Sequence, residues 1–76
     1  MYEVKLPRFS DDADESLVVL WYKKVGDTVD VGDTLLEVQT EKATSEITAE
    51  QSGVLQQIKV DRGETASVGE VLGVIS

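Results

Sequence analysis

Two side-chain types that carry much of enzyme chemistry are missing from this chain, which has no Cys and no His. Their absence excludes most enzymes that pair a nucleophile with a thiolate or imidazole, and it removes the commonest metal ligand. Asp and Glu are plentiful, 15 in all. A catalytic carboxylate, however, needs a desolvating pocket, which a domain of 76 residues can hardly form. We therefore expect a protein that is not an enzyme by itself and that holds no metal.

Lys42 is the titratable residue with the most unusual setting. It lies in the stretch VQTEKATSEI, residues 38–47, between two runs that both resemble β-strands. Glu41 precedes it and Ala43 follows it. A lysine beside a glutamate in a turn is usually a solvated surface pair. The spacing by itself therefore leaves two interpretations open: an ordinary turn residue, or a side chain that the rest of the domain is built to present.

The net charge of −8, from 15 acidic and 7 basic residues, points to protein partners. Such a charge repels phosphate backbones and anionic lipid, which argues against nucleic-acid binding and against membrane-surface binding. The chain opens without a signal-peptide pattern and has no apolar run near the roughly 20 residues of a spanning helix. We expect it to act in the cytoplasm, or in the mitochondrial matrix if a transit segment has been removed.

The elements that could position Lys42 belong to an internal repeat. VGDTVDVGDTLLEV, which starts at Val25, aligns with RGETASVGEVLGVI, which starts at Arg62, at a shift of 37 residues (62 − 25). Each half then contains a strand, a Gly-acid turn, a short strand, a second Gly-acid turn and a strand. Glycine suits such turns because a tight reversal often needs positive φ, and we expect the acid after it to stay hydrated.

The repeat predicts an all-β fold in a single domain, residues 1–76. The expected strands are short, rich in β-branched residues and separated by turns: LVVLWYKKV, TLLEVQT, TSEITAE, VLQQIKV and EVLGVIS. Two copies imply two similar antiparallel sheets related by pseudo-two-fold symmetry, as a small flattened barrel or sandwich. Gln39 and Ser76 end equivalent halves, so the turn after Gln39 and the chain end should lie at opposite poles.

A hairpin of residues 34–40 and 44–50 would place Lys42 at its tip. A tight turn at Glu41-Lys42 sets Thr40 opposite Ala43, and it puts four residues on the core face: Leu36, Val38, Ile47 and Ala49. The same register sets Glu37 opposite Glu46, a like-charge pair. Neither turn residue is Gly or Asn, which favours a type I turn over the primed types.

The segments LWYKKVGDTVDVGDTLLEVQTEKATSEI, SGVLQQIKV and VGEVLGVI closely resemble the lipoyl domains of 2-oxo acid dehydrogenase complexes. The resemblance covers nearly the whole chain. In that family the attachment lysine lies in a Thr-Asp-Lys-Ala turn, of which Thr40-Glu41-Lys42-Ala43 matches three positions, with Glu41 in place of Asp. The family fold is a barrel-sandwich hybrid, also called the lipoyl/biotinyl hammerhead.

The resemblance implies a carrier, with lipoic acid in amide linkage to Lys42. Thr40, Glu41 and Ala43 would then flank the attachment site, and Glu41 and Ala43 would be read by a lipoate ligase or lipoyl transferase. The implied partners are a thiamine-diphosphate-dependent decarboxylase, an acyltransferase core and dihydrolipoamide dehydrogenase. Because the reactive dithiol belongs to the cofactor, the lack of Cys and His is no obstacle.

Two alternatives share the hammerhead fold. Biotin carriers also modify a hairpin lysine, but their turn typically reads Ala-Met-Lys-Met, whereas the sole Met here is Met1. An unmodified hammerhead used for protein contact would leave the matching turn without a role.

The connection after the first strand is the part of the repeat that departs from symmetry. Glu3 resembles Glu46 at a shift of 43, so this connection is six residues longer than its counterpart (43 − 37). It carries four carboxylates: Asp11, Asp12, Asp14 and Glu15. One interpretation is a solvated surface loop. The resemblance implies another, because in lipoyl domains this loop lies beside the modified turn and helps the decarboxylase to choose its carrier.

Overall fold

The computed structural model describes residues 1–9, 11 and 14–76, and in that part of the chain every regular element is a β-strand. The strands are β1 (Tyr2–Lys5), β2 (Glu15–Trp21), β3 (Thr28–Val29), β4 (Thr34–Gln39), β5 (Thr44–Thr48), β6 (Gly53–Ile58), β7 (Thr65–Ser67) and β8 (Val71–Ile75). Within the same residues, no helix has the length and apolar character needed to cross a membrane.

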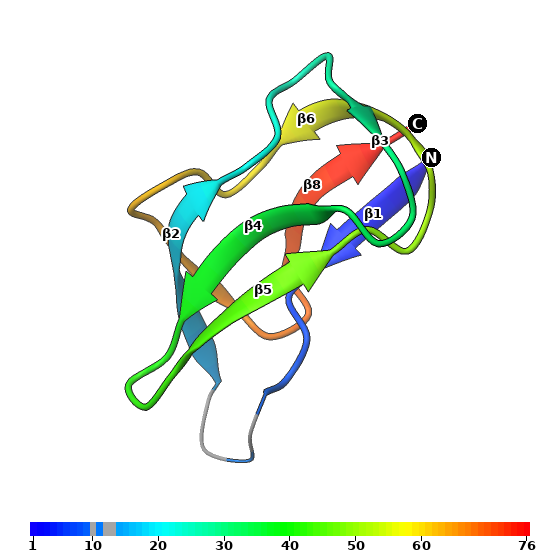
Figure 1. The fold of residues 1–76 in the computed structure, drawn as a ribbon. Helices are drawn as coiled ribbons and strands as arrows, with labels where there is room; N and C mark the ends of the chain where they lie inside the picture. The colour runs from blue at the N-terminus through cyan, green and yellow to red at the C-terminus, as the bar shows by residue number, and fades with distance from the viewer. Residues whose placement is uncertain (10, 12–13) are drawn as a thin grey trace.

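The strands form two four-stranded antiparallel sheets, which confirms the predicted fold class (Figure 1). The strand order is β1-β8-β6-β3 in one sheet and β5-β4-β2-β7 in the other. A shift of 37 residues carries β2, β3 and β4 onto β6, β7 and β8, and β1 corresponds to β5, so the two orders are equivalent. Each sheet therefore takes two strands from each half of the repeat, and neither half can form its sheet alone.

The Gly-acid turns repeat in their hydrogen bonds as well as in their residues. Gly26 and Gly63 have φ of 98° and 86°, a conformation that side chains with a Cβ rarely adopt. After the first glycine, the Asp27 carboxylate accepts a bond from the Lys24 N–H at 2.8 Å; after the second, the Glu64 carboxylate accepts one from the Asp61 N–H at 2.8 Å. The acids remain exposed, as expected, but they also close their own turns.

The core lies between the two sheets and is built from the inward side of each strand. The predicted core face of the hairpin is confirmed, since the residues it named are buried: Leu36, Val38, Ile47 and Ala49. Leu35 is also fully buried, although strict alternation would place it outside. The β4–β5 register shifts between Thr34 and Leu36, and this bulge turns Leu35 inward.

Trp21 and Tyr22 take opposite sides of the sheet, as strand alternation predicts. Trp21 packs against the core, and its indole N–H donates to the Val60 carbonyl at 2.8 Å. A Cβ on Gly73 would lie 3.0 Å from the Trp21 ring, so glycine leaves room for the indole beside β8. Tyr22 is exposed.

The two termini lie side by side at one end of the molecule, and the β4–β5 turn lies at the other (Figure 1). The longest extent of the domain is 32 Å. The predicted arrangement of opposite poles is therefore confirmed. A group attached at the turn would be held away from any chain that continues beyond either terminus.

Candidate functional site

The β4–β5 hairpin has the register that the sequence predicts. Leu36 pairs with Ile47 and Val38 pairs with Ser45, and the last pair before the turn is Gln39 with Thr44. The apolar members fix this register, because a slip of one residue would turn them out to solvent. Lys42 therefore occupies a turn whose two strands are anchored in the core.

The turn itself is closed between Thr40 and Ala43. The Thr40 N–H donates to the Ala43 carbonyl at 2.9 Å, and the Thr40 hydroxyl donates to the same oxygen at 3.2 Å. No described residue other than glycine has positive φ, which rules out a primed turn at Glu41-Lys42 and agrees with the predicted type I. Glu41, Lys42 and Ala43 are exposed, and Thr40 is half-buried.

A like-charge pair lies on the outer face of the hairpin, as the register requires. Glu37 pairs with Glu46 across β4 and β5. Tyr22 partly offsets the repulsion, since its hydroxyl donates to Glu37 Oε1 at 3.2 Å. Partial desolvation, then the bond to Glu37 and the charges of both glutamates, raise the pKa of the Tyr22 phenol, so it stays a donor at neutral pH.

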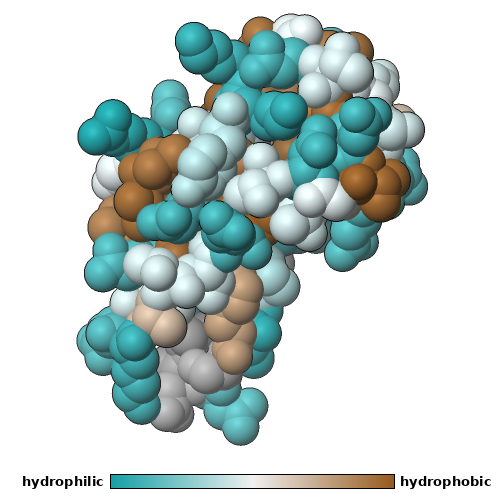
Figure 2. All heavy atoms as spheres, viewed as in Figure 1, coloured by the Kyte–Doolittle hydropathy of each residue, from teal (hydrophilic) through white to brown (hydrophobic). Residues whose placement is uncertain are grey.

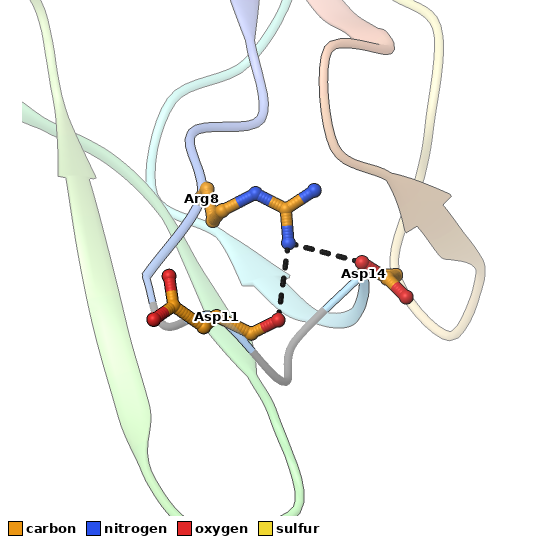
Figure 3. A network of polar contacts seen from close by, with 3 residues as sticks. All are labelled: Arg8, Asp11 and Asp14. Carbon is orange, nitrogen blue, oxygen red and sulfur yellow. Dashed lines mark hydrogen bonds and ion pairs between the residues drawn. The ribbon is translucent and has the colours of Figure 1, made fainter.

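Arg8 organises the acidic connection between β1 and β2. Its guanidinium forms an ion pair with Asp14 Oδ1 at 3.0 Å and donates to the Asp11 backbone carbonyl at 3.5 Å (Figure 3). The Asp14 carbonyl in turn accepts a bond from the Val68 N–H at 2.9 Å. These contacts link Arg8, Asp11 and Asp14 to one another and, through the Asp14 carbonyl, to the backbone of Val68.

The four predicted recognition acids do not share one environment. Asp11 and Asp14 are exposed in the connection, and Asp11 uses its backbone rather than its side chain to bind Arg8. Glu15 is the first residue of β2 and pairs with Ser67, so it belongs to the sheet and not to the loop where the sequence placed it. Asp12 lies outside the described residues.

Sequence reasoning did not single out Arg8 or Phe9. Phe9 is an exposed aromatic residue, and it faces β4 and β5 across an open groove of ≈ 660 Å³. The other lining residues come from the hairpin: Glu37, Thr44, Ser45, Glu46 and Thr48. The only sequence signal was an arginine and an aromatic inside an otherwise acidic connection. In the view of Figure 2, the described residues at the lower end of the molecule include both hydrophilic and apolar groups.

Comparisons with known proteins place the chain in a family. A family model described as "Biotin-requiring enzyme", the biotin- and lipoyl-attachment model, matches residues 2–75. The chain is 45% identical over all 76 residues to the dihydrolipoyllysine-residue succinyltransferase component of the 2-oxoglutarate dehydrogenase complex of Bacillus subtilis. It is 38% identical over 74 residues to the acetyltransferase component of the pyruvate dehydrogenase complex of Corynebacterium glutamicum. It spans only 18% and 11% of these two proteins.

Two solved structures share the fold. The lipoyl domain of the 2-oxoglutarate dehydrogenase complex of Azotobacter vinelandii superposes with a TM-score of 0.82 at 30% identity, covering 100% of this chain and 96% of that one. The urea carboxylase of Kluyveromyces lactis superposes with a TM-score of 0.65 at 24% identity over 7% of its chain, which shows the fold alone. With a family model matched over nearly its whole length, the chain belongs to the biotin- and lipoyl-attachment family.

Proposed function

We propose that this domain is a covalent carrier that bears lipoic acid on Lys42 and moves acyl groups and reducing equivalents between active sites of a 2-oxo acid dehydrogenase complex. The observation that carries the proposal is the predicted hairpin, with Lys42 exposed at its tip on strands anchored in the core. The 30% identical lipoyl domain, which this chain matches from end to end, supports lipoate over other acyl groups.

The residues present fit a lipoyl group. The turn stands at the pole away from both termini, so the attached chain has solvent around it and a tether does not obstruct it (Figure 1). The lipoyl group, when bound, supplies a dithiolane that can be reduced and acylated. The protein supplies the rest: a turn, closed by the bonds between Thr40 and Ala43, that holds the backbone of Lys42 in place at the end of the hairpin.

Glu41 and Ala43 would identify the lysine to the modifying enzyme. Both are exposed beside Lys42, where a lipoate ligase or lipoyl transferase can reach them without unfolding the hairpin. Biotin carriers usually have Met on both sides of the lysine, so these two residues would also keep the domain out of the biotin pathway.

The partners follow from the relatives and remain part of the proposal. A thiamine-diphosphate-dependent decarboxylase would load the arm, an acyltransferase core would unload it, and dihydrolipoamide dehydrogenase would reoxidise it. The relatives are components of such complexes, and the chain corresponds to about a fifth or less of their length. We propose a cytoplasmic or mitochondrial-matrix setting for the same reason.

The test is modification of the purified domain by lipoate ligase with ATP and lipoate, followed by intact-mass and peptide-mass measurement. We expect one adduct, on Lys42, and none on four other lysines of the chain: Lys5, Lys23, Lys24 and Lys59. Lys42→Arg should fold with unchanged stability, within about 0.5 kcal/mol, and accept nothing. An adduct on another lysine would contradict the assignment. Labelling by biotin ligase would favour a biotin carrier, and no label from either enzyme would favour a contact module.

The β1–β2 connection would select the decarboxylase by charge. Asp11→Asn removes a charge from a side chain that makes no bond to Arg8, whereas Asp14→Asn also breaks the Arg8 ion pair. If charge is what the decarboxylase reads, both variants should be acylated more slowly at low salt, and the difference should disappear as salt is raised. If only Asp14→Asn is slow, and remains slow at high salt, the connection acts through its folded shape instead.

A further inference from the structure

Building on the proposed carrier function, we infer that the groove between Phe9 and β5 is a resting site for the acylated side chain of Lys42. The ligand class is a saturated eight-carbon chain that ends in a five-membered disulfide ring. The groove is lined by Phe9 on one side and by the outer face of the hairpin on the other, including Thr44, Glu46 and Thr48.

The groove begins within reach of Lys42. Thr44 is two residues along the chain from Lys42, and Glu46 is four, or about 13 Å at the rise of an extended strand. A lysine side chain with an eight-carbon acyl group spans about 14 Å from Cα to the ring when extended, at roughly 1.3 Å per bond. A chain that folds back along the outer face of β5 can therefore bring its ring to Phe9 without any movement of the hairpin.

Phe9 is the apolar element that such a chain needs. It is 38% exposed, so part of its ring faces solvent and part lies against the protein. Contact with methylene groups would remove apolar surface of both partners from water, and a sulfur atom beside an aromatic ring adds an attractive contact. The other five lining residues carry hydroxyl or carboxylate groups, which stay hydrated and leave the Phe9 ring as the preferred apolar surface.

The structure holds Phe9 in place from both sides. Before it, Leu6 is buried, its N–H donates to the Glu70 carbonyl at 3.0 Å, and its own carbonyl accepts from Gly69 at 2.9 Å. After it in the chain, Asp11 and Asp14 bind the guanidinium of Arg8, the immediate neighbour of Phe9 (Figure 3). These bonds anchor the chain at Leu6 and at Arg8, and so keep Phe9 near β5.

The pseudo-symmetry indicates that this aromatic is not part of the common scaffold. Leu6 corresponds to Ala49, and after Ala49 the chain reaches β6 within four residues, at Gly53. The second half has no counterpart to Phe9, because its connection lacks the six additional residues. The longer connection thus places one exposed aromatic beside the hairpin that carries Lys42.

The experiment uses the domain after lipoylation, with the adduct on Lys42 verified by mass. One readout is nuclear Overhauser contacts between the Phe9 ring and the acyl methylenes. The other is the rate at which dithiothreitol reduces the dithiolane ring of the lipoyl group. In that reaction the reagent loses two electrons as it closes its own disulfide, and the dithiolane gains them with two protons. One sulfur–aromatic contact can favour the groove-bound lipoyl chain over the free chain by about two to one. Because the reagent reaches the free third of the chains in the parent and all of them in Phe9→Ala, we expect reduction to be about threefold faster in the variant.

Matched variants separate the possible outcomes. Phe9→Leu keeps an apolar side chain and should fall between the parent and Phe9→Ala. Val31→Ala removes an exposed apolar residue from the turn between β3 and β4 and should behave as the parent. Equal rates in Phe9→Ala and parent, with no ring contacts, would overturn the inference and leave the carrier function standing. Acceleration in Leu17→Ala alone would also overturn it, because Leu17 lies on β2, on the far side of β4. Failure of Lys42 to accept lipoate would overturn both the carrier function and the resting site.

Discussion

Replacing Glu46 with Gln should stabilise the hairpin that carries Lys42. Glu46 faces Glu37 across β4 and β5, and the two side chains share the exposed outer face. Directly opposed residues have Cβ atoms about 5 Å apart, and like charges in this position cost about 0.2–1 kcal/mol. Glu46→Gln removes the repulsion and leaves Glu37 free to keep its bond from the Tyr22 hydroxyl.

The gain is large enough to measure in a domain of this size. A stabilisation of about 0.5 kcal/mol corresponds to a rise in Tm of about 2–4 °C for a domain of 60–100 residues. Thermal unfolding followed by circular dichroism at low salt gives the Tm directly. Near 1 M salt the Debye length is about 3 Å, shorter than the separation of the pair, so most of the gain should disappear.

Glu3, at the position that pseudo-symmetry relates to Glu46, provides the control for Glu46→Gln. It corresponds to Glu46 but faces Val74 instead of an acid, and it is exposed on the edge strand β1. Glu3→Gln changes the net charge by the same amount, so it measures the general relief of repulsion in a chain of charge −8. If Glu3→Gln and Glu46→Gln raise the Tm equally, or if the gain of Glu46→Gln persists at high salt, the pairwise explanation is wrong.

Two further predictions concern the scaffold. Gly53→Ala should lower the free energy of unfolding in urea by about 1–3 kcal/mol, because φ is +155° and a Cβ would stand 2.8 Å from the Ser76 carbonyl oxygen. Gly32 has φ of +93° but nothing within 4 Å of its Cβ position, so Gly32→Ala should lower it less. The reverse order would contradict the steric argument. The Asp30 N–H, and then Lys23 at 3.4 Å, lower the pKa of Asp33 below its ordinary 3.8, so its charged form stabilises the fold above that pH and the contribution is lost as pH falls through the folded value. The Tm difference between the parent and Asp33→Asn should therefore shrink on acidification, and a difference that grows would refute the sign.

The hairpin could be predicted from the sequence because its information is local. Leu36, Val38 and Ile47 alternate with polar residues at a period of two, and a single face of each strand is buried, so one register satisfies both strands. The glycine turns were predictable for a similar reason, since a positive φ restricts the residue type at one position. The same local rules place the exposed lysine at the tip without any knowledge of the rest of the fold.

What the sequence did not predict depends on contacts between distant residues or on breaks in periodicity. The bulge that buries Leu35 inserts one residue into the alternation, and no local pattern marks it. The ion pair between Arg8 and Asp14 and the groove beside Phe9 depend on the path of an irregular connection, which hydrophobic periodicity does not describe. The exchange of strands between the halves is likewise a property of the assembled sheets.

The symmetry of the frame explains why its functional features gather at one pole. The equivalent strands and Gly-acid turns bury the core and are needed whatever the domain carries, so they cannot distinguish one pole from the other. At the point where the second half ends at Ser76, the first half continues through Thr40 to Ala43 into β5. The departures from symmetry, this turn and the long connection held by Arg8, both lie at that pole (Figure 1). A partner that reads this domain can therefore tell the pole that carries Lys42 from the pole that carries the two termini by these two segments.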